Sequence, residues 1–134
     1  MENKNNIQSV LCLNRLVFDK IEFKRLGIAS ECELELKIQS SIAQRQDADV
    51  YRINLTLYGD KPEEYVFEIS LTGYFSIEQS AELTEELKNA LIAKNATAIL
   101  MPYLRSEVSL LTAQPGMECV VMPVLNINNL LEEG

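Results

Sequence analysis

The residue types that carry most enzyme chemistry are scarce in this sequence. Histidine is absent from all 134 residues, so the commonest general base, the usual partner of a serine or cysteine nucleophile and a favoured zinc ligand are missing. Paired carboxylates could still act as acid and base, because 20 Asp and Glu residues are present. The composition therefore weakens most enzyme classes and leaves carboxylate chemistry open.

The carboxylates that stand out have structural explanations. Glu35 and Glu68 lie opposite the apolar positions of alternating segments, where a carboxylate is normally solvated. Glu82, Glu85 and Glu86 fall in the first half of an expected helix, where the helix dipole favours negative charge. The sequence contains no glycine-rich phosphate-binding motif. We therefore predict no catalytic, cofactor-binding or metal-binding residue, and we do not expect an enzyme.

The cysteines and the net charge indicate location and partners. Cys12, Cys32 and Cys119 are widely spaced and form no CxxC pair, as expected for buried apolar residues in a reducing compartment. The first ten residues lack the pattern of a secretory signal, and the longest uncharged run, 95–104, is too short to cross a bilayer. A net charge of −8 disfavours nucleic acid and anionic membranes. We predict a cytoplasmic protein that does not insert into a membrane.

A hydrophobic period of two predicts four strands. The turn sequence GDKPEE joins the last two into an antiparallel hairpin. The first strand is either continuous or interrupted near Asp19. The strand segments are 10–16 together with 20–28, then 31–39, 51–57 and 65–72.

After the strands, the period becomes about 3.6 residues, which predicts two helices. Ser76 is expected to cap the first helix, whose apolar stripe reaches about Leu91. Either Asn95 or Thr97 caps the second, which runs to about Thr112 and is ended by the sequence QPG. Both helices are therefore expected in the second half of the chain.

Pro102 interrupts the second predicted helix. A proline in a helix interior removes one backbone hydrogen bond and clashes with the carbonyl four residues back, at a cost of roughly 3 kcal/mol. Capping by Thr97 places Pro102 just past the first turn, whereas capping by Asn95 places it deeper and predicts a kink. The sequence leaves both arrangements open.

The order of the elements predicts the fold class. Strands followed by helices are typical of an α+β protein. We predict a single domain over residues 1–134, in which a four-stranded antiparallel sheet carries two helices packed on one face. The exposed sheet edges favour pairing with another copy. Apolar residues exceed what one sheet face needs, and they either complete the core or form a groove for another chain.

Four segments resemble the SecB family of export chaperones. A strand that ends in Gly, aromatic, Phe, Ser, Ile matches residues 73–77, and a helix that opens with Ile, Leu, x, Pro, Tyr, x, Arg matches 99–105. A later Pro-Val pair matches 123–124, and an Asp-Val-Tyr strand matches 49–51. The resemblance extends from about Ile21 to Ile127 in order and spacing.

This resemblance implies a chaperone without cofactor or catalytic activity, assembled as a tetramer from paired dimers. Family members hold unfolded precursors in apolar grooves lined by the sheet, the loop between the first two strands and the main helix. Unrelated clients require adaptable apolar side chains. On this basis the polypeptide-binding residues are expected to be Ile21, Phe23, Leu26, Leu34, Leu36, Tyr103 and Leu104.

The resemblance also bears on a partner, the export motor SecA. Family members contact SecA through acidic residues on the outer face of the sheet. Val66 and Glu68 fall on two matching positions, whereas Lys20 and Lys24 replace two acidic ones. The chain ends at Gly134, before the further helix that supports a second SecA contact in the family. These differences predict weakened SecA docking.

Our first hypothesis is a cytoplasmic, homo-oligomeric holdase, dimeric or tetrameric, that binds unfolded polypeptide clients without nucleotide. A dedicated chaperone of a toxin–antitoxin system, holding one unstable antitoxin, is the first alternative. The second is an oligomerisation module of the same fold, whose apolar surface is buried between subunits. The sequence leaves the client and the oligomeric state open.

Overall fold

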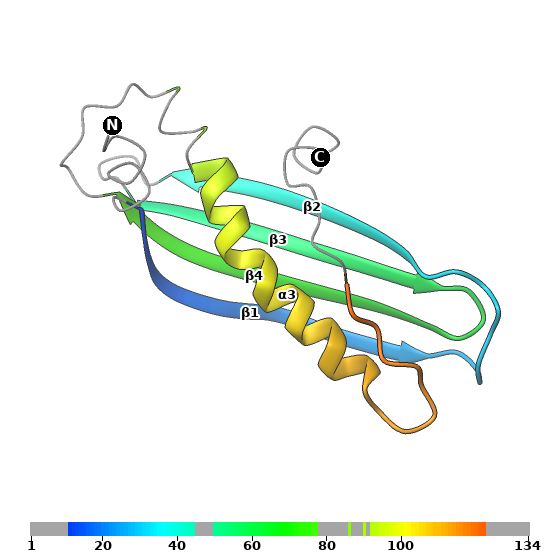
Figure 1. The fold of residues 1–134 in the computed structure, drawn as a ribbon. Coiled ribbons are helices and arrows are strands. Elements are labelled where there is room, and N and C mark those ends of the chain that lie inside the picture. The colour runs from blue at the N-terminus through cyan, green and yellow to red at the C-terminus, as the bar shows by residue number, and fades with distance from the viewer. Residues whose placement is uncertain (1–10, 45–49, 78–85, 87–89, 91, 123–134) are drawn as a thin grey trace, which may run out of the picture.

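The computed structural model describes residues 11–44, 50–77, 86, 90 and 92–122. Its four strands form one antiparallel sheet, as predicted, and their order in the sheet is β1-β4-β3-β2. The helix α3 crosses one face of this sheet (Figure 1). The elements are β1 (Leu11–Arg25), β2 (Glu35–Gln44), β3 (Val50–Lys61), β4 (Tyr65–Ile77), the π-helical turn η1 (Ile92–Ala96) and α3 (Thr97–Thr112).

The strand order makes the chain cross the sheet between β1 and β2. β2, β3 and β4 pair consecutively, whereas β1 pairs with β4, so β1 and β2 lie at opposite edges. This is a Greek-key type of connection. The crossing is made by residues 26–34, which we call the β1–β2 loop. It lies at the end of the sheet where the β3–β4 turn also lies (Figure 1).

β1 is continuous, with two irregularities that preserve its apolar face. Its register against β4 shifts between Leu13 and Arg15 and between Phe18 and Lys20. Each inserted residue, Asn14 and Asp19, resets the alternation, because a one-residue shift turns following side chains to the other face. The residues that consequently pair with the apolar positions of β4 are Leu13, Leu16, Phe18, Ile21 and Phe23.

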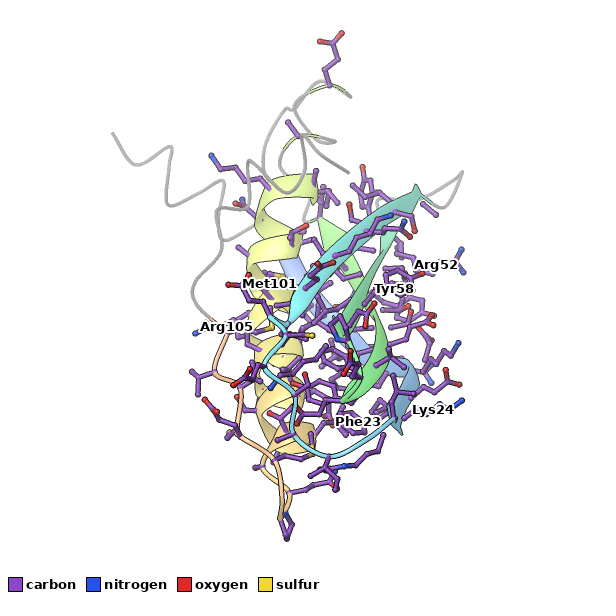
Figure 2. All side chains as sticks on the ribbon, turned by 90° about the vertical axis from the view of Figure 1, so that its right-hand side faces the viewer. Phe23, Lys24, Arg52, Tyr58, Met101 and Arg105 are labelled. Carbon is purple, nitrogen blue, oxygen red and sulfur yellow. The ribbon has the colours of Figure 1, made fainter. Side chains whose placement is uncertain are left out.

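The core lies between the sheet and α3. We call the sheet face toward α3 the inner face and the opposite one the outer face. Figure 2 shows α3 on one side of the sheet and Lys24, Arg52 and Tyr58 on the other. The helix buries one stripe at spacings of four residues, Leu100, Leu104 and Val108. Its fully buried partners on the inner face include Ile53, Leu55, Leu57, Ile69, Leu71 and Phe75.

Two predictions about the helices need correction. Ser76 does not cap a helix, because β4 continues to Ile77 and Ser76 pairs with Cys12 and Val50. The strand continues since Phe75 and Ile77 keep the alternation and are buried. The first predicted helix otherwise falls mainly on 78–91, of which the structure describes Glu86 and Ala90 alone. These two residues are α-helical, and the rest of that helix lies outside the described residues. The one α-helix whose bounds the described residues show is α3, where the sequence predicted two.

The start of α3 also differs from the prediction. The turn η1 leads directly into α3, so the residue at the cap position, Ala96, is itself helical, with φ −64° and ψ −42°, and no side chain caps the helix. Pro102 is therefore the sixth residue of α3 and is preceded by a further helical turn. Its missing N–H removes the usual partner of the Ala98 carbonyl. The side chain of Pro102 is exposed.

The three cysteines differ in their exposure to solvent. Cys12 and Cys32 are half-buried, whereas Cys119 is exposed, so the prediction of three buried cysteines is wrong for Cys119. Cys119 lies after α3, where its Sγ donates a weak hydrogen bond to the Ser109 carbonyl at 3.6 Å. Among the residues that the structure describes, no helix is long and apolar enough to span a membrane.

We predict that Pro102→Ala stabilises the protein. Alanine restores the backbone N–H that proline lacks, and removal of an exposed side chain costs little packing, so the free energy of unfolding should rise by about 1–3 kcal/mol. Urea unfolding measures the difference. Ser106→Ala, at another exposed position of α3, controls for helix propensity and should add no more than about 0.5 kcal/mol. A Pro102→Ala protein that is no more stable than the wild type would contradict this prediction.

Candidate functional site

The described residues show no cluster of reactive side chains, but several large apolar side chains are exposed. No three His, Cys, Asp or Glu residues within these ranges are arranged to hold a metal ion. Single exposed apolar side chains are common in soluble proteins, so position decides which of them matter. In the β1–β2 loop, Leu26 is 49% exposed and Ile28 is 83% exposed, and Ile21 on the adjoining strand is also exposed. Leu26 and Ile28, which we call the loop patch, form the candidate site.

Backbone contacts to Glu64 fix the loop patch in place. The N–H groups of Leu26 and Gly27 both donate to the carbonyl oxygen of Glu64, at 2.8 and 3.2 Å. The Glu64 side chain turns back toward the same loop, where its Oε1 accepts a hydrogen bond from the Ser30 N–H at 3.0 Å. The loop is therefore held on the β3–β4 turn at three of its N–H groups.

Glu64 is a buried carboxylate with a matching cation. Its residue is 2% exposed, and Oε1 lies 2.8 Å from the Lys61 ammonium. The Lys61 hydrogen bond, followed by the Ser30 N–H, lowers the pKa of Glu64 below its usual value. The same contact raises the pKa of Lys61. Both groups are consequently charged at neutral pH, as a buried ion pair requires.

Arg25 ties the loop to the segment that follows α3. Its Nε donates to the Gly27 carbonyl at 3.0 Å, and its Nη2 donates to the Gly116 carbonyl at 3.0 Å. Gly27 fits here because a Cβ at this position would lie 2.5 Å from the carbonyl oxygen of Glu63. Glycine is needed for this close approach of two backbones.

Three stacked rings lie on the inner face, at the end of the sheet where β1 leads into the loop. Phe23, Tyr65 and Phe67 have ring centroids 5.1 to 6.3 Å apart. Gly59 leaves the room that Phe67 occupies, since a Cβ on Gly59 would lie 2.2 Å from the Phe67 ring. Tyr65 and Phe67 are buried, whereas Phe23 is partly buried at the sheet edge. The rings form a rigid apolar base at the end of the sheet that carries the loop.

The segment 117–122, which we call the return segment, runs back along α3. Arg105, Ser109 and Thr112 hold it through its backbone: Arg105 Nε donates to Met122 O at 3.2 Å, Ser109 Oγ donates to Val120 O at 3.0 Å, and the Val120 N–H donates to Thr112 Oγ1 at 2.8 Å. Met122 is buried in the core. Figure 1 shows this segment over the same sheet face as α3, so both cover the inner face.

The structure separates the predicted polypeptide-binding residues into three groups. Leu104 is 0% exposed and belongs to the core, because it lies on the buried stripe of α3. Phe23 and Leu34 are partly buried against the core. Ile28 is exposed but was not among the predicted residues, although it is a large apolar residue next to Gly27 in the sequence. The exposed members are Ile21, Leu26, Leu36 and Tyr103.

The predicted SecA contacts lie on the outer face. Glu68 Oε1 forms an ion pair with Lys20 Nζ at 3.2 Å, and this contact raises the pKa of Lys20. Val66 pairs with Lys24 across the two strands. A shallow depression of about 580 Å³ lies here. It is lined by Glu22, Lys24, Tyr58, Gly59, Asp60, Val66, Phe67 and Glu68, so charges of both signs meet in it.

A polar network that the sequence analysis missed occupies the middle of the outer face. Asn54 Nδ2 lies 2.9 Å from Ser70 Oγ and 3.0 Å from Thr72 Oγ1. Thr72 also donates to the carboxylate of Asp19, the inserted residue of β1. The sequence signal for this network is the alternation of Asn, Ser and Thr residues along the paired strands β3 and β4. The network makes the outer face polar where the inner face is apolar.

Comparison with known proteins identifies one family. The family model described as Preprotein translocase subunit SecB matches residues 13–133. The Protein-export protein SecB of Anaplasma phagocytophilum (strain HZ) is 28% identical over 95 residues. These are 71% of this chain and 59% of that protein, so the chain spans less than two thirds of the relative's length.

A solved structure shares the fold. It is a Mycobacterium tuberculosis SecB-like chaperone in complex with a ChAD peptide from the HigA1 antitoxin. The match has a TM-score of 0.73 and 12% sequence identity, and it covers 94% of this chain and 98% of that one. At this identity the likeness concerns the arrangement of strands and helix.

Proposed function

Because this chain belongs to the SecB family, we propose that it is a holdase chaperone that binds unfolded polypeptides without nucleotide and delays their aggregation. The observation that carries the proposal is the loop patch, where apolar side chains are held in solvent by buried polar contacts. Exposed apolar area that binds through shape-tolerant contacts suits many unrelated clients. Leu36 and Tyr103 are further exposed candidates for the same contact.

Two client classes remain within this proposal. Export precursors fit the name of the Anaplasma relative, and a single antitoxin fits the peptide bound by the mycobacterial relative. We favour unfolded precursors as the general class, because the loop patch consists of apolar side chains, whose contacts select weakly among sequences. Identification of chains that co-purify with the protein distinguishes a broad client set from one antitoxin.

We further propose that the protein is cytoplasmic and homo-oligomeric, as a dimer or a tetramer. β1 and β2 are the edge strands of the described sheet, and an edge presents backbone groups that a second copy can pair. The alternative of an oligomerisation module without clients requires the loop patch to be buried between copies. Analytical ultracentrifugation gives the oligomeric state, and solvent accessibility at Ile28 in the assembled protein decides between the two.

We predict that the purified protein, at stoichiometric amounts, slows the aggregation of several unfolded clients. The double variant Leu26→Ser, Ile28→Ser should bind these clients roughly tenfold more weakly, because apolar contact area is lost. Light scattering of a refolding client measures both effects. Ile42→Ser is the matched control, since Ile42 is also exposed but lies on β2, outside the loop patch. A wild-type protein without effect on any client, or a double variant equal to the wild type, would contradict the proposal.

SecA is a weaker proposed partner. Lys20 already pairs with Glu68, so the carboxylate that would meet a basic surface is partly neutralised. We predict weak, salt-sensitive SecA binding that Lys20→Glu strengthens several-fold and Glu68→Arg removes, because surface charge steers such contacts. Titration of SecA at two salt concentrations measures this. Binding that is the same in both variants and in the wild type would exclude the outer face as the contact.

A further inference from the structure

One residue, Glu64, accepts the hydrogen bonds that hold both halves of the β1–β2 loop. Glu64 accepts the Leu26 and Gly27 N–H groups at its carbonyl and the Ser30 N–H at its carboxylate. The residue that carries the most exposed large apolar side chain, Ile28, lies between these anchored positions. The loop backbone is thus fixed on both sides of Ile28.

This arrangement keeps apolar surface exposed. A mobile loop with two large apolar side chains would tend to fold them against neighbouring apolar groups, because burial of each stabilises by roughly 1.5–3 kcal/mol. Gly27 packs closely on the Glu63 backbone, where a Cβ on residue 27 would lie 2.5 Å from the carbonyl oxygen. The hydrogen bond from the Ser30 N–H to the Glu64 carboxylate holds the second half of the loop on the β3–β4 turn. The Glu64 contacts therefore hold Leu26 and Ile28 in solvent.

The ion pair fixes the carboxylate itself. Lys61 lies in the same turn, three residues before Glu64, and its ammonium is 2.8 Å from Oε1. Arg25 approaches from β1 and binds Gly27 O and Gly116 O, so a second basic residue supports the loop from the other side. Because a buried carboxylate without partners is strongly destabilising, the side chain has one favourable position, toward Lys61 and Ser30.

We propose that Glu64 is a positioning residue for polypeptide binding, which acts by holding the β1–β2 loop in the conformation that presents Leu26 and Ile28. The inference rests on the proposed function. Binding to a loop that is already fixed costs less conformational entropy than binding to a loop that must first become ordered. Glu64 contacts no client in this account, and its effect passes entirely through the loop.

The test compares Glu64→Ala with Glu64→Gln in the full-length protein. Alanine removes both side-chain contacts, whereas the glutamine Oε1 can still accept from Ser30 and Lys61. Glu31→Ala is the matched control, because Glu31 is an exposed carboxylate in the same loop. Backbone amide exchange, read by mass spectrometry, reports separately on residues 26–34 and on β3 and β4. Client binding is measured on the same samples.

We expect Glu64→Ala to speed amide exchange in residues 26–34 by about tenfold, because one charge-assisted hydrogen bond to the loop is lost. The exchange rates of β3 and β4 should change less than about twofold. Client affinity should fall several-fold, and Glu64→Gln should restore most of both properties. Unchanged exchange in 26–34, equal loss of protection across the sheet, or loosened exchange with unaltered client affinity would each overturn the inference. A wild-type protein that binds no client refutes the proposed function instead, and the exchange data still decide whether Glu64 holds the loop.

Discussion

The structure depends on the need to cover one apolar sheet face. Every second residue of β3 and β4 is buried, so the inner face cannot face water without exposing most of the apolar side chains of both strands. The stripe of Leu100, Leu104 and Val108 on α3 supplies the cover, and Met122 of the return segment adds to it. Both bulges of β1 serve the same requirement, since each keeps the apolar residues of a long edge strand on the inner face.

A covered inner face restricts where apolar binding surface can remain. The helix and return segment occupy the inner face, and hydroxyl and amide groups around Asn54 make the middle of the outer face polar. The chain must also cross from one edge of the sheet to the other. The loop that makes this crossing is held by hydrogen bonds to the buried Glu64, while Leu34 near its end packs against the core. The most exposed large apolar side chain of the described residues, Ile28, lies in this loop at the end of the sheet.

Local pattern predicted the four strands and the helix that ends at Thr112, because the hydrophobic period distinguishes a strand from a helix. It could not place Leu104 in the core rather than in a groove, since both need an apolar residue. The cap of α3 was missed because η1, a π-helical turn, continues into it and no polar cap is needed. Glu64 was predicted as part of a turn, and its role follows from Ser30, which lies 34 residues earlier and comes close only through the fold.

The central claim is that unfolded polypeptide binds at the end of the sheet that carries the β1–β2 loop, and not on the outer face. A photo-cross-linking amino acid placed at Ile28, or at Arg52 on the outer face (Figure 2), tests this directly in the presence of an unfolded client. The account predicts strong cross-linking from position 28, little from position 52, and little from either when the client is folded. Equal cross-linking from both positions, or stronger cross-linking from position 52, would contradict it.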